Sequence, residues 1–283
     1  MEIIRQLDLS QIIRTALAED VGQGDITTAA TVASDRAGRA TISVKERDEI
    51  VFCGGFMFEK VFTATDGQPQ IASLASEGTR LLRGAIVAEI DGLLAGLLIG
   101  ERVALNFVQL MSGIATATRR YVDAIAGSRA RIIDTRKTHP GLRALEKYAV
   151  RCGGGTNHRF GLDSGVLIKE NHIAAAGGLS SALERARSTA PHTFRIEIEC
   201  ETLSQVEEAV AAGAASILLD NMTIDDMRRA RKIAGNSVLL EASGGITLDS
   251  IKAVAEAGVD LISVGALTHS VRVVDLSMRI EPS

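Results

Sequence analysis

The chain has 283 residues, of which 46% are hydrophobic and 23% are charged, and its formal net charge is −4. These figures predict a globular protein with a sizeable core, made of one large α/β domain or of two domains. A pI near 5.8 argues against a general nucleic-acid-binding protein, which would carry a basic face. The three cysteines are far apart and form no CxxC pair, so neither a zinc site nor a disulfide framework is indicated.

The N-terminal segment MEIIRQLDLSQ has no basic region followed by an apolar core, so it does not predict a signal peptide. The most apolar run, residues 93–100, stops at Glu101 and Arg102 and is too short to cross a bilayer. We therefore expect a cytoplasmic protein that binds neither nucleic acid nor membranes.

Residues 1–100 have the pattern of an α+β domain. Ser10 is predicted to cap a short helix, SQIIRTALAED, whose apolar residues have helical spacing. The next segment, EDVGQGDITT, has the composition of a polar, glycine-rich loop. The runs ATISVKE and AIVAEID alternate apolar and polar residues, as half-buried strands do, and they predict an antiparallel sheet.

Residues 93–126 contain few helix breakers and predict a long helical connector between two domains. From residue 130 onward, short β-branched runs alternate with amphipathic helical segments. Such βα units predict a parallel sheet that is either doubly wound or curled into a TIM-like barrel. The runs are RIIDT, GVLIK, FRIEIE, SILLD, SVLLEA and LISVG.

The ends of these strands favour the barrel. Nearly every apolar run ends in a charged residue or a glycine, and from Glu199 onward the spacings are 21, 23 and 22 residues. Because the C-terminal ends of barrel strands converge on one mouth, such residues would share a site. The alternative for each residue alone is an ordinary solvated loop charge. The residues concerned are Lys169, Glu199, Asp220, Glu241, Ser243 and Gly265.

Residues 134–172 form a cationic stretch within an acidic protein. They contain seven Lys or Arg against four Asp or Glu, three of the five His, and three consecutive glycines that let a backbone approach a ligand closely. The stretch predicts a pocket for a small, highly charged anion, held by Arg forks and Lys charges. Within it, Arg143, Lys147 and Arg151 have helical spacing and are predicted to form a solvated helix face instead.

Two glycine turns predict a phosphate site. Gly244 and Gly245 stand directly before a helix that Thr247 could cap, so free N–H groups and the helix dipole would attract an anion there. VGALTHS adds a second turn one βα unit later, and the loops after the last strands of TIM-like barrels often hold a phosphate. Either turn alone could be an ordinary tight turn.

Acidic residues on neighbouring strands predict a sugar or metal site. Glu197, Glu199 and Glu201 alternate along one strand and share a face, and Asp220 is the natural partner from the next strand. Carboxylate oxygens suit Mg²⁺, which proteins usually bind through one or two carboxylates and substrate phosphates. Cations, acids and glycine turns together point to a phosphoribosyl donor and an anionic acceptor.

Several separated motifs resemble a single family. The stretch DTRKTHPGLRALEKYAVRCGGGTNHRFGLDSGVLIKENHI closely resembles the signature of the quinolinate phosphoribosyltransferases. EDVGQGDITT, GERVALNFVQLMSGIAT, IEIECE, ILLDNM, EASGGI and SVGALTHS are similar to this family in the same order, so the resemblance covers essentially the whole chain. It implies a pentosyltransferase of NAD biosynthesis that converts quinolinate and phosphoribosyl pyrophosphate to nicotinate mononucleotide, pyrophosphate and CO₂, with Mg²⁺.

The same resemblance implies an architecture. We expect an α+β N-terminal domain with an antiparallel sheet at residues 1–112 and an incomplete TIM-like α/β barrel at residues 113–270. A C-terminal segment at residues 271–283 is expected to pack back on the N-terminal domain. The resemblance also implies a homodimer in which Arg102 is donated across the interface, and His139 stands where threonine is commoner in this family.

The resemblance further assigns roles to residues. Lys137, Glu199 and Asp220 would be catalytic, with Lys137 near the pyrophosphate and the two acids near the ribose hydroxyls and Mg²⁺. The residues implied to bind quinolinate are Arg102, Thr135, Arg136, Lys137, His158, Arg159 and Lys169. Those implied to hold the 5′-phosphate are Ser243, Gly244, Gly245, Val264, Gly265 and Ala266.

Three other functions stay open at this point. A paralogous phosphoribosyltransferase-like enzyme linked to molybdate operons has the same fold, although NHRFGL and KENHI favour the quinolinate enzyme. A Schiff-base aldolase or lyase could use Lys169 or Lys137 on a sugar phosphate, but it would need a desolvated lysine. A binding protein without activity would not need the full set of residues.

Overall fold

The computed structural model of the chain describes residues 8–283, so most of the segment considered for a signal peptide lies outside the described residues. The chain divides into two compact units. The first unit contains the residues up to 119 together with 139–154 and 270–283, and the second contains residues 120–138 and 155–269. The division expected at residues 112 and 270 stays a prediction.

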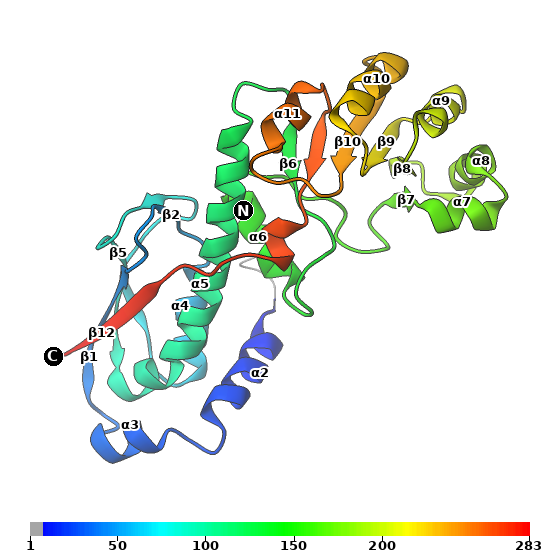
Figure 1. Ribbon diagram of the computed structural model, residues 1–283. Coiled ribbons are helices and arrows are strands. Elements are labelled where there is room, and N and C mark those ends of the chain that lie inside the picture. Colours follow the sequence, from blue (N-terminus) through cyan, green and yellow to red (C-terminus); the bar gives the residue numbers. More distant parts are fainter. Residues whose placement is uncertain (1–7) are drawn as a thin grey trace. The chain divides into compact units, whose positions relative to one another are not determined.

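The first unit is built on a four-stranded antiparallel sheet with the strand order β12-β1-β5-β3. The expected alternation is present in β1, where Ala40, Ile42 and Val44 are buried and the residues between them are half-buried. The strands of this unit are β1 (Ala37–Val44), β3 (Gln70–Leu74), β5 (Ile86–Leu93) and β12 (Leu276–Pro282), with a small separate pair of β2 (Ile50–Val51) and β4 (Arg80–Leu81) (Figure 1).

The first helices of this unit correct two predictions. Ser10 is the first residue of its helix and does not cap it, and the Asp8 carboxylate accepts the Ser10 N–H at 2.9 Å. The segment expected to be a loop is one only at residues 22–25, because α2 extends to Val21 and a second short helix begins at Ile26. The Asp25 carboxylate caps this helix by accepting the Thr28 N–H at 3.0 Å. The helices of the first unit are α2 (Ser10–Val21), α3 (Ile26–Thr31), α4 (Phe56–Ala64), most of α5 (Leu94–Ala124) and α6 (Arg143–Cys152).

The expected helical connector is one continuous helix, α5, of 31 residues. Neither Gly100 nor Gly113 interrupts it. Gly113 has a packing reason to be glycine, since a Cβ there would lie 2.4 Å from the carbonyl oxygen of Arg272. The glycine therefore lets the chain leading into β12 cross α5 at close range.

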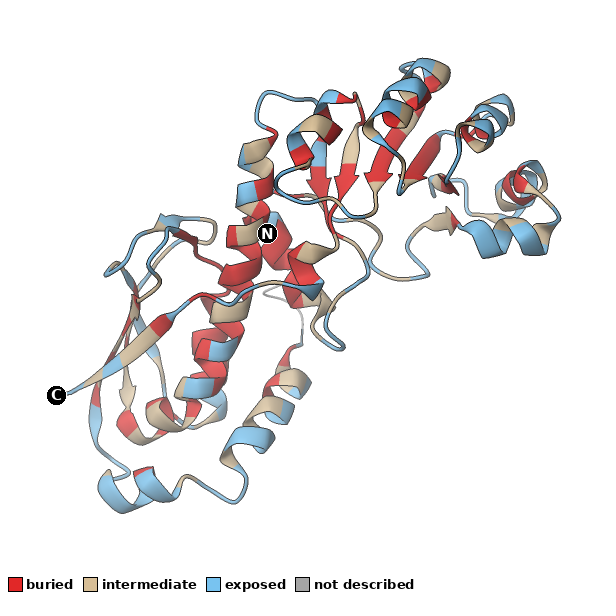
Figure 2. Cartoon of the chain, in the orientation of Figure 1, coloured by how far each residue is buried: buried red, intermediate tan, exposed pale blue. Residues whose placement is uncertain are grey.

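Buried hydroxyl groups on α5 serve the core of the first unit. Ser112 Oγ accepts the Cys53 N–H at 3.0 Å, and Thr116 Oγ1 accepts the Val51 N–H at 2.8 Å. By length and composition, α5 is the one helix within residues 8–283 that could cross a membrane, but 56% of its most apolar stretch is buried inside the protein (Figure 2). Burial against protein and internal hydrogen bonds are the features of a core helix.

The helix face predicted to be solvated on α6 is only partly so. Arg151 is exposed and Arg143 is half-buried, but Lys147 is only 3% exposed, so the prediction is wrong for Lys147. The physical reason is that residues 145–150 are all buried, so α6 has no face that is polar along its whole length.

His139 lies in the first unit and contacts α6. Its ring Nδ1 is 2.5 Å from Oε1 of the fully buried Glu146, and its backbone N–H donates to the same carboxylate at 3.3 Å. Burial raises the pKa of Glu146, while the contacts with His139 oppose that rise. His139 thus helps to hold a buried acid within this unit.

The second unit is a six-stranded parallel sheet with the order β6-β11-β10-β9-β8-β7. The first strand of this unit, β6, pairs with its last strand, β11, so the sheet curls round. The sheet is left open between β6 and β7, which confirms the incomplete TIM-like barrel. Its strands are β6 (Arg131–Ile133), β7 (Val166–Ile168), β8 (Ile196–Cys200), β9 (Ser216–Asp220), β10 (Leu239–Ser243) and β11 (Leu261–Ser263). Its helices are α7 (Glu170–Ala176), α8 (Leu179–Thr189), α9 (Leu203–Ala211), α10 (Ile224–Ala234), α11 (Ile251–Glu256) and α12 (Ala266–His269) (Figure 1).

The three cysteines are all buried, which predicts slow thiol chemistry in the folded protein. Burial raises the pKa of Cys200 to about 12 and the pKa of Cys53 well above its usual value. Because the thiolate is the reactive species, we expect a colorimetric thiol reagent at about pH 8 to react only slowly before unfolding. In denaturant, the same reagent should react quickly with all three cysteines, which are Cys53, Cys152 and Cys200. Rapid reaction of Cys200 in the folded protein would contradict this expectation.

Candidate active site

A cavity of about 510 Å³ opens at the carboxyl ends of the parallel strands, where residues far apart in the sequence meet. Its lining includes eleven of the residues expected to bind ligands: Thr135, Arg136, Lys137, His158, Arg159, Lys169, Glu199, Asp220, Ser243, Gly244 and Gly245. Leu167, Leu218, Asn221, Glu241 and Ser263 complete the lining.

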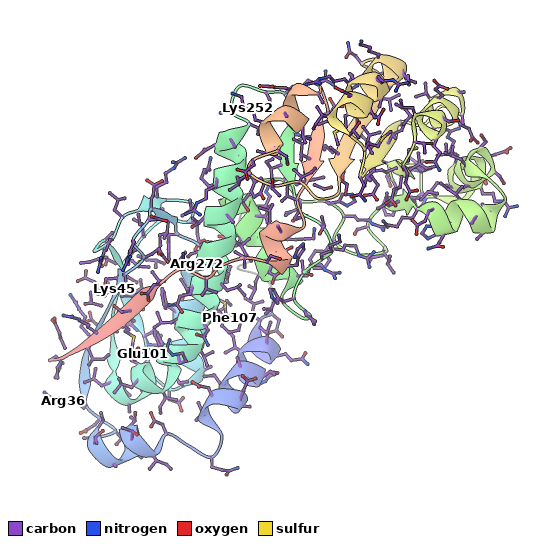
Figure 3. All side chains as sticks on the ribbon, in the orientation of Figure 1. Arg36, Lys45, Glu101, Phe107, Lys252 and Arg272 are labelled. Carbon is purple, nitrogen blue, oxygen red and sulfur yellow. The ribbon has the colours of Figure 1, made fainter. Side chains whose placement is uncertain are left out.

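The other residues expected at the site do not line this cavity. Residues 264–266 follow β11, and a Cβ on Gly265 would come within 3.4 Å of the Lys137 side chain, so this turn is adjacent to the cavity wall. Arg102 belongs to the first unit, where it is exposed on α5. Its neighbour in the chain, the half-buried Glu101, is labelled in Figure 3.

Lys169 and Glu199 form an ion pair between the ends of two adjacent strands, β7 and β8. Lys169 Nζ lies 2.6 Å from Glu199 Oε2, and the glutamate side chain is only 6% exposed. Burial raises the pKa of Glu199, the lysine opposes this rise, and the nearby Asp220 adds to it. A lysine engaged in an ion pair with a buried carboxylate does not have the free amine in an apolar setting that a Schiff-base mechanism requires.

Asp134 anchors the segment that carries His158. It is fully buried at the end of β6, and its carboxylate accepts the His158 N–H at 2.8 Å and the Asn157 side-chain amide at 2.5 Å. The Thr156 N–H donates to the carbonyl oxygen of Ile132 at 2.8 Å, so this segment lies along the free edge of β6. The basic residues that follow are therefore held by the open side of the barrel.

Both ring nitrogens of His158 have partners within the second unit. Nδ1 accepts the Arg159 N–H at 2.7 Å, and Nε2 lies 3.2 Å from Glu197 Oε2 and 3.8 Å from Glu241 Oε2. Since Nδ1 acts as an acceptor, the proton of the neutral ring lies on Nε2 and is directed at the two carboxyl groups. The expected contact of His158 with quinolinate stays a prediction.

Two arginines give the cavity a concentrated positive charge. Arg159 donates to the carbonyl oxygen of Gly165 at 3.0 Å, while its buried Nε has no hydrogen-bond partner among the described residues. Burial lowers the pKa of Arg159, and the charge of Arg136 lowers it further. A carboxylate is the ligand that fits here, because it would accept hydrogen bonds from a guanidinium and relieve the repulsion between the two.

The turn after β10 can be formed only with glycine at position 244. Gly244 has φ 95°, and a Cβ there would lie 2.1 Å from Asn221 Oδ1. The Asn221 N–H donates to the Ser243 carbonyl oxygen at 2.9 Å, which fixes the two turns against each other. Gly245 also has positive φ, at 60°, but the space beside it is open.

The expected helix cap at Thr247 is absent. The helix α11 begins only at Ile251, with Ser250 as its N-cap and no capping side chain, and the Thr247 N–H donates to Ser250 Oγ at 3.0 Å. A turn stands where the helix was expected to begin. Any anion at the glycine turn would therefore be bound by the turn itself rather than by this helix.

We expect Gly244→Ala to impair the site far more than Gly245→Ala. Both changes put alanine at positive φ, which costs roughly 1–2 kcal/mol, but only the first also drives a Cβ into Asn221. A loss of about 1.4 kcal/mol in binding free energy corresponds to a tenfold weaker affinity. In a steady-state assay, we therefore expect Gly244→Ala to raise the KM for the phosphoribosyl donor by about tenfold or more. Equal KM values for the two variants would show that this turn does not contact the donor.

Two acids that the sequence pattern had singled out lie one layer below the strand ends, whereas Leu167, Leu218, Asn221 and Ser263 of the lining carried no signal that had been used. Glu241 was identified as a strand-end charge, but it lies two residues before Ser243 and so points to the same side of β10, deeper in the barrel. Glu197 has the same relation to Glu199 on β8, whereas Glu201 is exposed beyond the end of that strand. The idea of three equivalent acids on one face is therefore wrong for Glu201.

Glu199 and Asp220 are the residues that could hold a divalent cation. Each approaches the cavity from the end of its strand, and the charge of Asp220 contributes to the raised pKa of Glu199, so a cation between them would be electrostatically favoured. Asp220 Oδ2 accepts the Asn221 side-chain amide at 2.8 Å, which leaves its other oxygen for a ligand. Two carboxylates with substrate phosphates are a ligand set that suits Mg²⁺.

Two family models match the chain over nearly all of its length. "Quinolinate phosphoribosyl transferase, N-terminal domain" matches residues 25–112, and "Quinolinate phosphoribosyl transferase, C-terminal domain" matches residues 114–279. The chain belongs to the quinolinate phosphoribosyl transferase family. The family resemblance noted in the motifs is thereby confirmed.

Relatives in this family match the chain from end to end. A Bacillus subtilis protein described as a probable nicotinate-nucleotide pyrophosphorylase (carboxylating) is 44% identical over 277 residues, which cover 98% of this chain and 95% of that protein. A Mycobacterium leprae protein described as a nicotinate-nucleotide pyrophosphorylase (carboxylating) is 44% identical and covers 94% of this chain and 95% of its own length. The crystal structure of NadC from Streptococcus pyogenes is similar with a TM-score of 0.92 at 40% identity, covering 97% of each chain.

Proposed function

We propose that the chain transfers the phosphoribosyl group of phosphoribosyl pyrophosphate to quinolinate, with decarboxylation, in NAD biosynthesis in the cytoplasm. The products would be nicotinate mononucleotide, pyrophosphate and CO₂. The observation that carries the proposal is the cavity at the mouth of the barrel, where Arg136, Lys137, Arg159 and Lys169 converge in a protein of net charge −4. Membership of the quinolinate phosphoribosyl transferase family supports this proposal. The proposed reaction involves neither nucleic acid nor a membrane.

The basic residues suit the dicarboxylate substrate. Arg136 and Arg159 carry planar forks for carboxylates, and Lys169 adds a charge fixed by Glu199. We assign Thr135 and His158 to the same wall and Lys137 to the pyrophosphate side. Neutralising quinolinate in this way would orient its ring nitrogen toward the sugar, which contributes to rate by removing rotational freedom.

The acidic residues suit the sugar and the cation. As pyrophosphate leaves, positive charge develops on the ribose ring, and the carboxylates of Glu199 and Asp220 would stabilise it in a site with little water. Mg²⁺, when bound with the donor, would neutralise phosphate charge. The turns at residues 243–245 and 264–266 would hold the 5′-phosphate through backbone N–H groups. After transfer, the alkylated ring nitrogen is cationic, which eases loss of the neighbouring carboxylate.

We also propose a homodimer in which Arg102 completes the site of the partner subunit. Arg102 is exposed on α5, which leaves its guanidinium accessible. If the sites are shared, a mixture of inactive Arg102→Ala and inactive Lys169→Ala proteins should regain activity, because a hybrid dimer contains one site with neither change. Size-exclusion chromatography with light scattering should show a dimer. Failure of the mixture to regain activity under conditions of subunit exchange would contradict the shared site.

A direct assay tests the activity itself. The protein is incubated with quinolinate, phosphoribosyl pyrophosphate and Mg²⁺, and nicotinate mononucleotide and CO₂ are measured. We expect both products in equal amounts, and none when Mg²⁺ is removed with a chelator. A parallel reaction with nicotinate in place of quinolinate serves as the control. If nicotinate is used and quinolinate is not, the assignment is wrong.

A further inference from the structure

Glu241 is a buried acid between two cavities of the barrel. Its side chain is 1% exposed, and neither carboxyl oxygen has a partner among the described residues at hydrogen-bonding distance and angle. The Ser263 hydroxyl on β11 donates to the carbonyl oxygen of Ala242 at 3.2 Å, but it is close enough to Glu241 to lower the pKa of that acid. A carboxylate without donors in such a place is strongly destabilised, and a neutral carboxylic acid is the form that fits.

The charged and titratable groups around Glu241 favour the neutral acid as well. Glu197 approaches from β8 and Asp134 from the end of β6, and both add negative charge, while His158 Nε2 lies 3.8 Å away. Burial is the largest cause that raises the pKa of Glu241, Glu197 and Asp134 raise it further, and Ser263 opposes them. Burial and the neighbouring negative charges therefore both favour the protonated form of Glu241.

Glu241 lies in the wall between two cavities of the barrel. It lines the cavity at the carboxyl ends of the strands, and it lines a second cavity of about 370 Å³. The lining of the second cavity includes the first residues of several strands, such as Arg131, Val166 and Ser216, so this cavity lies toward their amino ends. This position lies between the cavity that would hold the ligands and a second space that those ligands would not fill.

We propose that Glu241 is the acid that gives a proton to the ring carbon from which CO₂ leaves. The proposal rests on the proposed function and adds a catalytic residue to it. The bond between the ring carbon and the carboxylate carbon breaks, CO₂ departs, and the electron pair stays on the ring carbon. The Glu241 O–H proton then forms the new C–H bond, and the resulting Glu241 carboxylate takes a proton from water through the second cavity.

Other proton donors in the cavity are less suited to this step. Lys169 is paired with Glu199 at 2.6 Å, and a lysine that gave up its proton would also give up the charge that holds an anionic ligand. The Nδ1 atom of His158 accepts the Arg159 N–H, and its Nε2 atom is directed at Glu197 and Glu241 rather than at the upper cavity. Glu241 is the acid whose proton is not needed to hold a ligand or another side chain.

Single-turnover rapid quench with labelled quinolinate tests the proposal, because it separates two steps. Formation of the dicarboxylate mononucleotide reports phosphoribosyl transfer, and its conversion to nicotinate mononucleotide reports decarboxylation. Glu241→Gln keeps the shape and neutrality of the acid but has no acidic proton. We expect its first step to keep the wild-type rate and its second step to slow by about 100-fold or more, the usual range for loss of a general acid.

The matched control is Glu201→Gln, the same chemical change at an exposed position just beyond β8, which should leave both steps unchanged. Equal slowing of both steps in Glu241→Gln would indicate a structural role and overturn the proposal, as would an unchanged second step. A divalent metal retained by the wild type through dialysis, and lost in Glu241→Gln, would also overturn it, since a metal ligand would carry no proton.

The wild-type protein provides a second test that does not depend on the folding of a variant. As pH rises through the raised pKa of Glu241, its neutral fraction falls, so the decarboxylation step should slow while the transfer step does not. A decarboxylation rate that is constant over the pH range where the protein stays folded would overturn the proposal. If the wild type forms neither mononucleotide, the proposed function fails instead, and the two failures are distinguishable.

Discussion

Asp134→Ala should unfold the support of the active site and lower activity together with stability. The change removes the acceptor for the His158 N–H and the Asn157 amide at a fully buried position. An unpaired buried donor costs about 1–3 kcal/mol, so with the lost packing we expect the free energy of unfolding to fall by about 2–4 kcal/mol. Denaturant unfolding followed by circular dichroism measures this change.

The loss of activity should exceed what partial unfolding explains. Without the Asp134 carboxylate, the segment that carries His158 and Arg159 is fixed to β6 only by the backbone bonds at Thr156. A displacement of about 1 Å in a positioning group can lower the rate by about 100-fold. We expect kcat/KM for quinolinate to fall by that order at a temperature where the variant is still folded. Asp163→Ala, at an exposed position further along the same connection between α6 and β7, is the control and should change neither quantity. A stable Asp134→Ala protein with wild-type kcat/KM would show that this anchor is dispensable.

Lys169→Met should be the most damaging change to the chemistry at this site. Methionine retains the length of the side chain but removes the charge that we propose faces quinolinate, and it leaves Glu199 without its partner at 2.6 Å. The substrate would lose a charge-assisted contact, and a buried acid would be left unpaired. We therefore expect kcat/KM to fall by about 10²–10⁴-fold. Initial rates at varied quinolinate concentrations measure it. Lys252→Met, on the exposed surface of α11, is the matched control (Figure 3).

The same variant should show a characteristic dependence of stability on pH. Lys169 opposes the rise in the pKa of Glu199, so removing it raises the pKa of Glu199 in the folded state further. Below the pKa of glutamate in the unfolded chain the acid is protonated in both states, and the change has little effect through this group. Above that pKa the glutamate of the unfolded chain has lost its proton, so folding must either take up a proton or bury an unpaired charge. The stability deficit of the variant should therefore grow as pH rises through the folded-state pKa. A deficit independent of pH would contradict this account of the pair.

The fold of the barrel unit was largely predictable because its cause is local. Six β-branched runs separated by amphipathic helices each became a strand of one parallel sheet, and the repeated spacing placed their ends at one mouth. The expected ligand residues from Thr135 to Gly245 accordingly line one cavity. Predictions that depended on one residue at a helix end were less successful: Ser10 and Thr247 do not cap helices, and Asp25 does.

Charges on α6 and β8 show why burial was harder to predict. Lys147 has the spacing of a solvated helix residue, yet it is 3% exposed, because other parts of the first unit cover α6. Glu197 and Glu201 both alternate with Glu199 along the chain, but one is buried in the barrel and the other is exposed. Spacing determines on which side of an element a residue lies, and only the packing of distant segments determines what covers that side.

The sequence by itself determined the strand and helix order of the barrel, the motifs that place the chain in its family, and the identity of the charged groups at the strand ends. These follow from periodicity and from residue types, which act over a few neighbouring positions. The tertiary structure alone decided that β6 pairs with β11, that Asp134 anchors the segment carrying His158, and that Glu241 lies without hydrogen-bond donors between two cavities. Each of these depends on contacts between segments far apart in the chain. For Glu241, burial and the nearby charges of Glu197 and Asp134, which raise its pKa, arise only when those segments pack together.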